Sequence, residues 1–226
     1  MNGVRRAVLL LSLSSCCLLW NSCGGFFLSN SDILTVTVSP AANSVSNGAC
    51  AVILAAGASP VDSIDLVLTS TTVGGTTATN TANATWSSSN TSVATVSAGV
   101  VTAASAATGN QTATITAKYG GQSGTCNVLT YTGTEPSSLS VNSSVTSPQV
   151  SQVFAVTAQA SLNNNSSSNL TSYVLWSSNA TSLATVDANG NVTVSSSATV
   201  GAQFTITATA VFSNGSITGT RTYTVL

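Results

Sequence analysis

Apolar and polar residues alternate in short runs along most of the chain. Residues 33–38 read I-L-T-V-T-V before Pro40 ends the run, and the same alternation recurs at residues 112–117 and 205–208. A period of two is typical of a strand with one buried face, and Pro, Asn-Gly and Gly-Gly mark turns between such strands. The pattern predicts an all-β protein whose short strands form a β-sandwich fold.

One stretch of the sequence occurs twice. Residues 86–97, which start at Trp86, return as residues 176–187, which start at Trp176, with eight of the twelve positions identical and no gap. A period of about ninety residues indicates two modules of about 100 residues each. We therefore expect a first domain over residues 33–132 and a second over residues 133–226.

The two modules differ most in the part of the first domain that precedes Trp86. The alternating positions that we match between the modules are Val52, Leu54 and Ala56 with Phe154, Val156 and Ala158. This match leaves an insertion at about residues 59–84, with an extra strand at 63–69 and a loop at 73–83. Surface loops accept added length at small cost, so the insertion is either neutral or the place of a binding site private to this module.

The joint between the modules is short. Residues 132–137 are polar and contain Pro136. A joint of this length and composition predicts two modules that sit in line with limited bending.

The N-terminus has the form of an export signal. Arg5 and Arg6 precede a mostly apolar run of fourteen residues, 7–20, and small residues follow. That run is shorter than the roughly 20 residues that span a bilayer, so it indicates a signal peptide over residues 1–22 and not a membrane-spanning helix. Residues 23–32 then form a tether.

This signal resembles that of a bacterial lipoprotein, in which a small residue precedes a Cys that is diacylated and becomes the mature N-terminus. The sequence before Cys16 is closer to the usual motif, whereas only Ser22 fits before Cys23. Cleavage before Cys16 would leave Cys17 and Cys23 as spare thiols in an oxidising compartment and would shorten the apolar run, which favours Cys23. The resemblance implies a lipoprotein at the bacterial cell surface or outer membrane. The alternative is a secreted protein without lipid.

The few charged residues exclude several classes of function. The 226 residues include nine charged side chains and no His. Without the signal the chain keeps Lys118 and Arg221 against five acidic residues, a net charge of 2 − 5 = −3, which gives no basic surface for nucleic acid. The lack of His excludes Ser-His-Asp and Cys-His catalysis and His metal sites. We expect no enzyme activity, no cofactor and no metal. At the pair Asp62 and Asp65, and at residues 187–190, we expect turn chemistry, with a calcium site as the alternative.

Cys50 and Cys126 are the two cysteines outside the signal region. If both face the core of the first module, a disulfide between them would close a loop of about 76 residues and add roughly 4 kcal/mol on the chain-entropy model. The alternative is a pair of buried free thiols, since Cys is also a small apolar core residue.

The repeated segments resemble bacterial immunoglobulin-like domains of group 2, the type found in invasin- and intimin-like surface proteins. The residues that carry the resemblance are W-S-S-S-N-T-S-V-A-T-V from Trp86, G-V-V-T at 99–102, T-A-T-I-T-A at 112–117 and T-C-N-V-L at 125–129. The resemblance covers nearly all of residues 33–226. It implies two tandem Ig-like β-sandwiches of the kind that serve as stalks, spacers or adhesive modules on exported bacterial proteins.

In such a sandwich Trp86 and Trp176 are expected to fill the core between the sheets, and a sugar-binding Trp is the alternative. We therefore expect a non-enzymatic cell-surface lipoprotein that is held to the membrane by its lipid and acts as a structural spacer or as an adhesin for an extracellular protein or glycan. The alternatives are a carbohydrate- or protein-binding module that uses the insertion, and a fibre subunit whose edge strands pair between chains.

Overall fold

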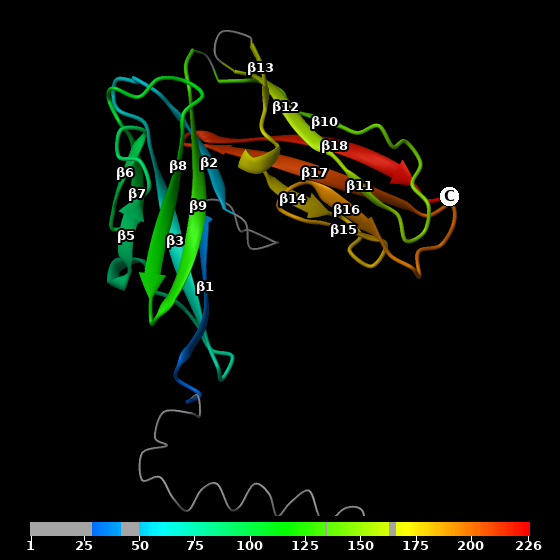
Figure 1. The fold of residues 1–226 in the computed structure, drawn as a ribbon, viewed down its shortest axis with the longest axis horizontal. Coiled ribbons are helices and arrows are strands. Elements are labelled where there is room, and N and C mark those ends of the chain that lie inside the picture. Colours follow the sequence, from blue (N-terminus) through cyan, green and yellow to red (C-terminus); the bar gives the residue numbers. More distant parts are fainter. Residues whose placement is uncertain (1–28, 42–49, 134, 163–165) are drawn as a thin grey trace, which may run out of the picture.

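The computed structural model describes residues 29–41, 50–133, 135–162 and 166–226. These residues form β-strands and two short 3₁₀ turns, η1 (Thr81–Asn83) and η2 (Thr171–Tyr173), and no α-helix occurs among them. The all-β prediction is confirmed, and the strands gather into two sandwiches (Figure 1). No helix in the described ranges is long and apolar enough to cross a membrane.

The first sandwich has nine strands within residues 29–41 and 50–133. They are β1 (Ile33–Pro40), β2 (Ala51–Ala55), β3 (Ser63–Thr72), β4 (Thr77–Thr79), β5 (Thr85–Ser88), β6 (Ala94–Ser97), β7 (Val100–Ala103), β8 (Thr112–Tyr119) and β9 (Gln122–Tyr131). One sheet has the order β1-β3-β7-β6, with β4 beside β3, and the facing sheet runs β2-β9-β8-β5. Alternate residues such as Leu66, Leu68 and Ile115 are buried between the sheets, as the period of two requires.

The second sandwich also has nine strands among its described residues, 135–162 and 166–226. They are β10 (Ser140–Asn142), β11 (Val153–Ala155), β12 (Thr157–Leu162), β13 (Ser166–Asn169), β14 (Leu175–Ser178), β15 (Ala184–Val186), β16 (Asn191–Val194), β17 (Gln203–Phe212) and β18 (Gly215–Thr224). One face is β14-β17-β18, and the other is made of β10-β12-β13 and β11-β16-β15. The ring of Tyr223 lies between Phe154 and Phe204 in the core, with ring centroids 5.1 and 5.4 Å away.

The region predicted as an insertion has a counterpart in the second sandwich. Leu68 N donates to Thr81 Oγ1 at 3.0 Å, and Ala158 N donates to Thr171 Oγ1 at 3.1 Å. Strand β3 thus corresponds to β11 and β12, β4 to β13, and η1 to η2. The prediction of an insertion at 59–84, with its loop at 73–83, is therefore wrong.

The modules instead differ in the segment that precedes β3. Strand β2 lies between β1 and β3, whereas the ten residues 143–152 between β10 and β11 contain no strand. The predicted match of Val52 with Phe154 is wrong. Strands β2 and β3 alternate in the same way, and the prediction aligned the second module with β2 when its counterpart is β3. The hydrogen bonds match Leu66 with Val156: each N–H donates, at 2.8 Å, to the carbonyl of the hairpin glycine, Gly99 or Gly190.

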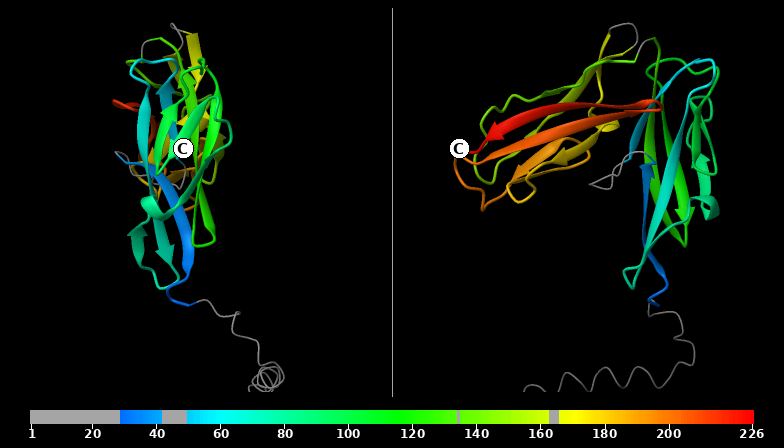
Figure 2. Two further views of the ribbon diagram at one scale, coloured as in Figure 1. Left: turned by 90° about the vertical axis from the view of Figure 1, so that its left-hand side faces the viewer. Right: turned by 180° about the vertical axis from the view of Figure 1, so that it is seen from behind.

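The two sandwiches share one sheet across the joint. Its order is β14-β17-β2-β9-β8-β5, and β2 runs parallel to β9 on one side and to the end of β17 on the other, where Ile53 pairs with Phe212. Figures 1 and 2 show that the strands of the second sandwich are steeply inclined to those of the first. The prediction of an in-line pair is wrong, because the strand pairing at β2, and not the polar joint, sets the angle.

The repeated stretch builds the same corner in both sandwiches. Trp86 Nε1 donates to Thr81 O, and Trp176 Nε1 donates to Thr171 O, each at 3.0 Å. The polar edge of each indole is thereby bonded to the 3₁₀ turn that precedes it, which leaves the apolar part of the ring to pack.

Replacing Gly190 by Ala should destabilise the second sandwich. Gly190 has a φ of +79°, and an added Cβ would stand 2.5 Å from Val156 O. The left-handed backbone alone costs an L-residue about 1–2 kcal/mol, and the close contact adds to that cost. Gly201→Ala is the matched control, because Gly201 has a φ of +85° and no atom within 4 Å of the added Cβ. Urea unfolding should show a larger loss of unfolding free energy for Gly190→Ala, and equal losses would contradict this account.

Candidate functional site

The cysteines predicted as sites fall into two groups. Cys23 and Cys16 lie outside the described residues. Cys50 and Cys126 form a disulfide with an S–S distance of 2.01 Å and a Cα–Cα distance of 4.5 Å, and both residues are buried. The bond ties the start of β2 to β9, beside the first residue pair of their parallel ladder. It therefore holds the strand that receives the second sandwich.

The two tryptophans are packed to different extents. Trp176 is 1% exposed in the second core, whereas Trp86 is half-buried against the first core. The 3₁₀ turn beside Trp176 carries Tyr173, which packs on the core, where the turn beside Trp86 carries the exposed Asn83. A larger neighbouring side chain thus accompanies the deeper burial of the second ring.

The second module packs on an apolar surface of the first module. Ile53, Leu129 and Tyr131 are 0%, 6% and 6% exposed and belong to the core of the second sandwich. In return, Leu175 and Val211 belong to the core of the first. Each hydrophobic core therefore includes side chains of the other module.

The hairpin of β17 and β18 is the part of the second module that reaches this surface. Strand β17 has ten residues and its counterpart β8 has eight. The register at the repeated Trp shows that the added residues are Val211 and Phe212. The ring of Phe212 contacts that of Tyr131 edge to face, with centroids 5.8 Å apart and planes at 89°. Aromatic pairs prefer this arrangement.

Tyr131 brings an ionisable hydroxyl to this junction. Burial raises the pKa of Tyr131, and the negative charges of Glu135 and Asp62 raise it further. Asp62 Oδ2 also accepts a hydrogen bond from Ala55 N at 2.6 Å, at the end of β2. The carboxylate of Asp62 thus helps to hold β2 in place.

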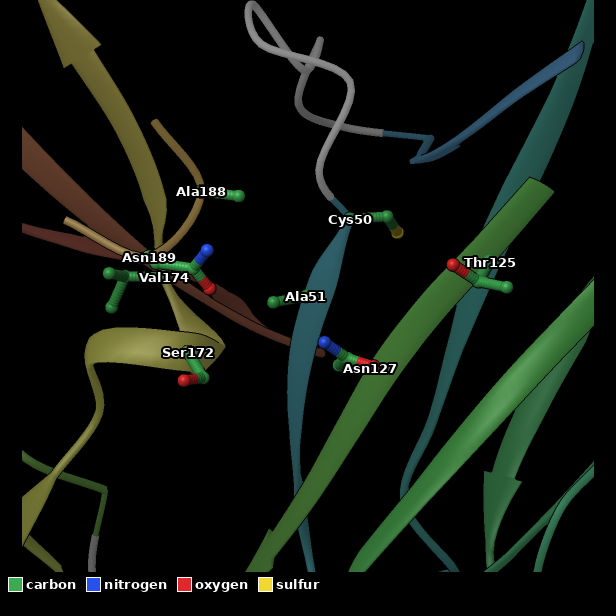
Figure 3. Close-up of a pocket in the computed structure, with 8 residues that line it drawn as sticks. All are labelled: Cys50, Ala51, Thr125, Asn127, Ser172, Val174, Ala188 and Asn189. Atoms are coloured by element: carbon green, nitrogen blue, oxygen red, sulfur yellow. The ribbon is translucent and has the colours of Figure 1, made fainter. Parts of the chain in front are cut away.

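A pocket of about 160 Å³ opens beside the junction. It is lined by Cys50, Ala51, Thr125 and Asn127 of the first module and by Ser172, Val174, Ala188 and Asn189 of the second. Figure 3 shows Asn127 and Asn189 on opposite sides of Ala51. The pocket therefore joins hydroxyl and amide groups from both modules, and the described residues of its lining include no charged side chain.

Asn189 is an extra residue of the second module. Twelve residues separate Trp86 from Gly99, and thirteen separate Trp176 from Gly190. The repeat runs without a gap through residue 187, so the added residue lies in the turn that follows, at Asn189. A local difference between the two copies thus contributes directly to the pocket.

Asp187 stabilises this longer turn. Its Oδ1 accepts hydrogen bonds from Asn189 N at 2.9 Å and Asn191 N at 2.8 Å, and its Oδ2 accepts one from Asn191 Nδ2 at 2.8 Å. Across the described ranges, no group of three or more His, Cys, Asp or Glu side chains could hold a metal ion. The Asp187 carboxylate therefore acts as a hydrogen-bond acceptor for its own turn.

Our sequence interpretation missed the junction surface. The signal that reveals it is a local loss of alternation: residues 128–131 at the end of β9 are all buried, as are residues 210–212 at the end of β17. Successive buried residues indicate a strand that is covered on both faces. In an otherwise alternating protein, such a run points to a contact with another layer.

The chain was compared with known proteins. No family model matches it, and no curated protein matches it in sequence. Among solved structures it is similar to the S-layer protein rSbsC(31-844), with 18% identity and a TM-score of 0.35 over 89% of this chain and 29% of that one, so it spans under a third of that protein. It is also similar to domains 4 and 5 of the S-layer protein SbsC, with 19% identity and a TM-score of 0.32 over 87% and 100% of the chains. Human protocadherin-24 EC1-2 is similar at 16% identity and a TM-score of 0.28 over 77% and 93%.

Asp187 should make the stability of the second sandwich depend on pH in the acid range. Its burial acts to raise the pKa, but hydrogen bonds from Asn191 and Asn189 outweigh this effect and lower the pKa of Asp187 below its usual value. A depressed folded-state pKa means that the stabilisation is full above the unfolded-state pKa, about 3.9, and is lost as the pH falls through the folded-state pKa. Asp187→Asn should reduce the loss of unfolding free energy below about pH 4. Asp65→Asn, in the first module, controls for the lost charge, and an unchanged pH dependence in Asp187→Asn would contradict the assignment.

Proposed function

We propose that this chain is a non-enzymatic lipoprotein of the bacterial cell surface, built of two group 2 Ig-like modules, that acts as a stiff, bent spacer. The observation that carries this proposal is that each hydrophobic core includes side chains of the other module. Two modules joined only by a flexible linker would not share core residues and would reorient freely. Here the sheet continues from one module into the other, and the modules exchange core residues.

The apolar contact makes the bend stiff. A hinge motion at the junction would expose Ile53, Leu129, Tyr131 and Phe212 to water. Burial of a large apolar side chain is worth about 1.5–3 kcal/mol, so four such side chains give on the order of 6 kcal/mol or more in favour of the docked form. A load on one module is then transmitted to the other, as a spacer or a platform for adhesion requires.

The chemistry of the chain supports a role without catalysis. The sequence has no His and five carboxylate side chains. Three of the five carboxylates accept hydrogen bonds from backbone N–H groups: Asp32 before β1, Asp62 at β2 and Asp187 at its turn. Acid–base catalysis needs titratable groups gathered at one place. The alternative of a binding module that uses an insertion at 59–84 loses its basis, because both copies carry that segment.

Replacing Phe212 by Ala should loosen the bend. The variant removes the edge-to-face contact with Tyr131 and empties the space at the end of β17, so the two sandwiches should sample other orientations. Small-angle X-ray scattering of the unlipidated mature chain (Cys23→Ser) should show a larger maximum dimension and a broader distance distribution. Tyr119→Ala is the matched control, because Tyr119 lies near the end of the corresponding hairpin and packs on the first core alone. A Phe212→Ala profile that superimposes on the parent profile would contradict the stiff junction.

Cys23 should carry the lipid anchor. After expression in a bacterial host, mass spectrometry of the mature N-terminus should find a diacylglyceryl group on Cys23. Cys23→Ser should move the protein from the membrane fraction to the soluble fraction, whereas Cys16→Ser should not. An unmodified mature N-terminus, or one that begins at Cys16, would contradict this assignment.

A further inference from the structure

The pocket between the two sandwiches has the composition of a site for a neutral, hydroxyl-rich ligand. Its polar lining consists of Thr125, Asn127, Ser172 and Asn189, and its apolar lining includes Ala51, Val174 and Ala188. Hydroxyl and amide groups both donate and accept hydrogen bonds, which suits ligand hydroxyls. Small apolar side chains suit the C–H face of a ring, and sites of this mixed kind occur preferentially at domain interfaces.

Most of these polar side chains are available to a ligand. The side chains of Thr125, Ser172 and Asn189 form no hydrogen bond within the described part of the chain, and all three residues are exposed. Asn127 Oδ1 accepts one hydrogen bond, from Thr114 Oγ1 at 3.4 Å. Its amide group donates none to the described residues, so it can donate to a ligand. Ligand hydroxyls would replace the water that these groups otherwise bind.

Charge and size limit the ligand further. No charged side chain occurs among the lining residues that the structure describes, and the nearby Asp187 carboxylate already accepts three hydrogen bonds within its turn. An ionised ligand would therefore lose hydration without gaining an ion pair. The volume of about 160 Å³ is below the roughly 300 Å³ at which pockets for drug-sized ligands begin, so it holds one ring and not a chain of rings.

The pocket exists only in the assembled junction, because each sandwich supplies half of its lining. Asn189, the extra residue of the second hairpin, is one of the two amides that face it, as Figure 3 shows. The stiff junction holds the two halves in fixed positions, which lowers the entropy cost of binding. We propose that this pocket binds one neutral sugar residue of a glycan, a role that goes beyond that of a spacer.

Saturation-transfer NMR on the mature chain tests this proposal. The probes are galactose, mannose, N-acetylglucosamine and N-acetylgalactosamine, with glucuronic acid and N-acetylneuraminic acid as charged comparators. At least one neutral sugar should bind with a dissociation constant on the order of 1 mM, as a single small ring allows. The charged sugars should bind at least about tenfold more weakly, since each would be desolvated without a partner.

Ser172→Phe should fill the pocket and abolish transfer to the neutral sugars. Ala82→Phe is the matched control, because Ala82 has the same place in η1 that Ser172 has in η2 and does not line the pocket. Asn189→Ala removes one amide from an exposed turn and should weaken binding about tenfold. The proposal is overturned if no neutral sugar binds, if binding survives Ser172→Phe, or if a charged sugar binds most tightly. The scattering profile of the chain is independent of these results, so a failed pocket and a failed spacer remain distinguishable.

Discussion

The position of β2 between β9 and β17 is the constraint on which the arrangement of the whole molecule depends. The strand runs parallel to both, so it belongs to the first sandwich and to the joint at once. The Cys50–Cys126 disulfide ties the start of β2 to β9, and the Asp62 carboxylate accepts a hydrogen bond from Ala55 N at its end. On the side away from β9, Ile53 pairs with Phe212 at the end of the second hairpin. The bend, the exchange of core residues between the modules and the pocket all follow from this strand, since each needs β17 to pack against β2.

The fold class and the two copies could be predicted from the sequence because they depend on local signals. Alternation with a period of two fixes which residues face a core, and the Trp stretch repeats with little change because both copies use it to seat the indole on a 3₁₀ turn. The equivalence of the early strands could not be predicted in the same way. Strands β2 and β3 both alternate, so by alternation alone Phe154 and Val156 could be aligned with either. The hydrogen bonds that Leu66 and Val156 give to the hairpin glycines match them with β3.

The angle between the two modules could not be predicted from the residues that link them, because those residues do not determine it. Residues 132–137 are polar and short, and on their own they allow an extended arrangement. The angle instead depends on the pairing of Ile53 with Phe212, two residues that lie almost 160 positions apart in the sequence. The same holds for the pocket, since Asn127 and Asn189 each look like ordinary exposed polar residues until the two modules are brought together. A contact between modules leaves only a weak trace in either one, here the loss of alternation at residues 128–131.

The differences between the copies are complementary, and this bears on how the protein can be used. The first copy has the additional strand β2, and the second has the hairpin that is two residues longer and reaches it. Neither feature occurs in the other copy: residues 143–152 form no strand, and β8 ends at Tyr119. A head-to-tail contact can repeat into a fibre only when each unit offers both halves on its outward faces. In this chain β2 and the β17–β18 hairpin already pair with each other, so neither is available to a second molecule. This favours a closed, bent pair of modules over a fibre built by repeating the same junction.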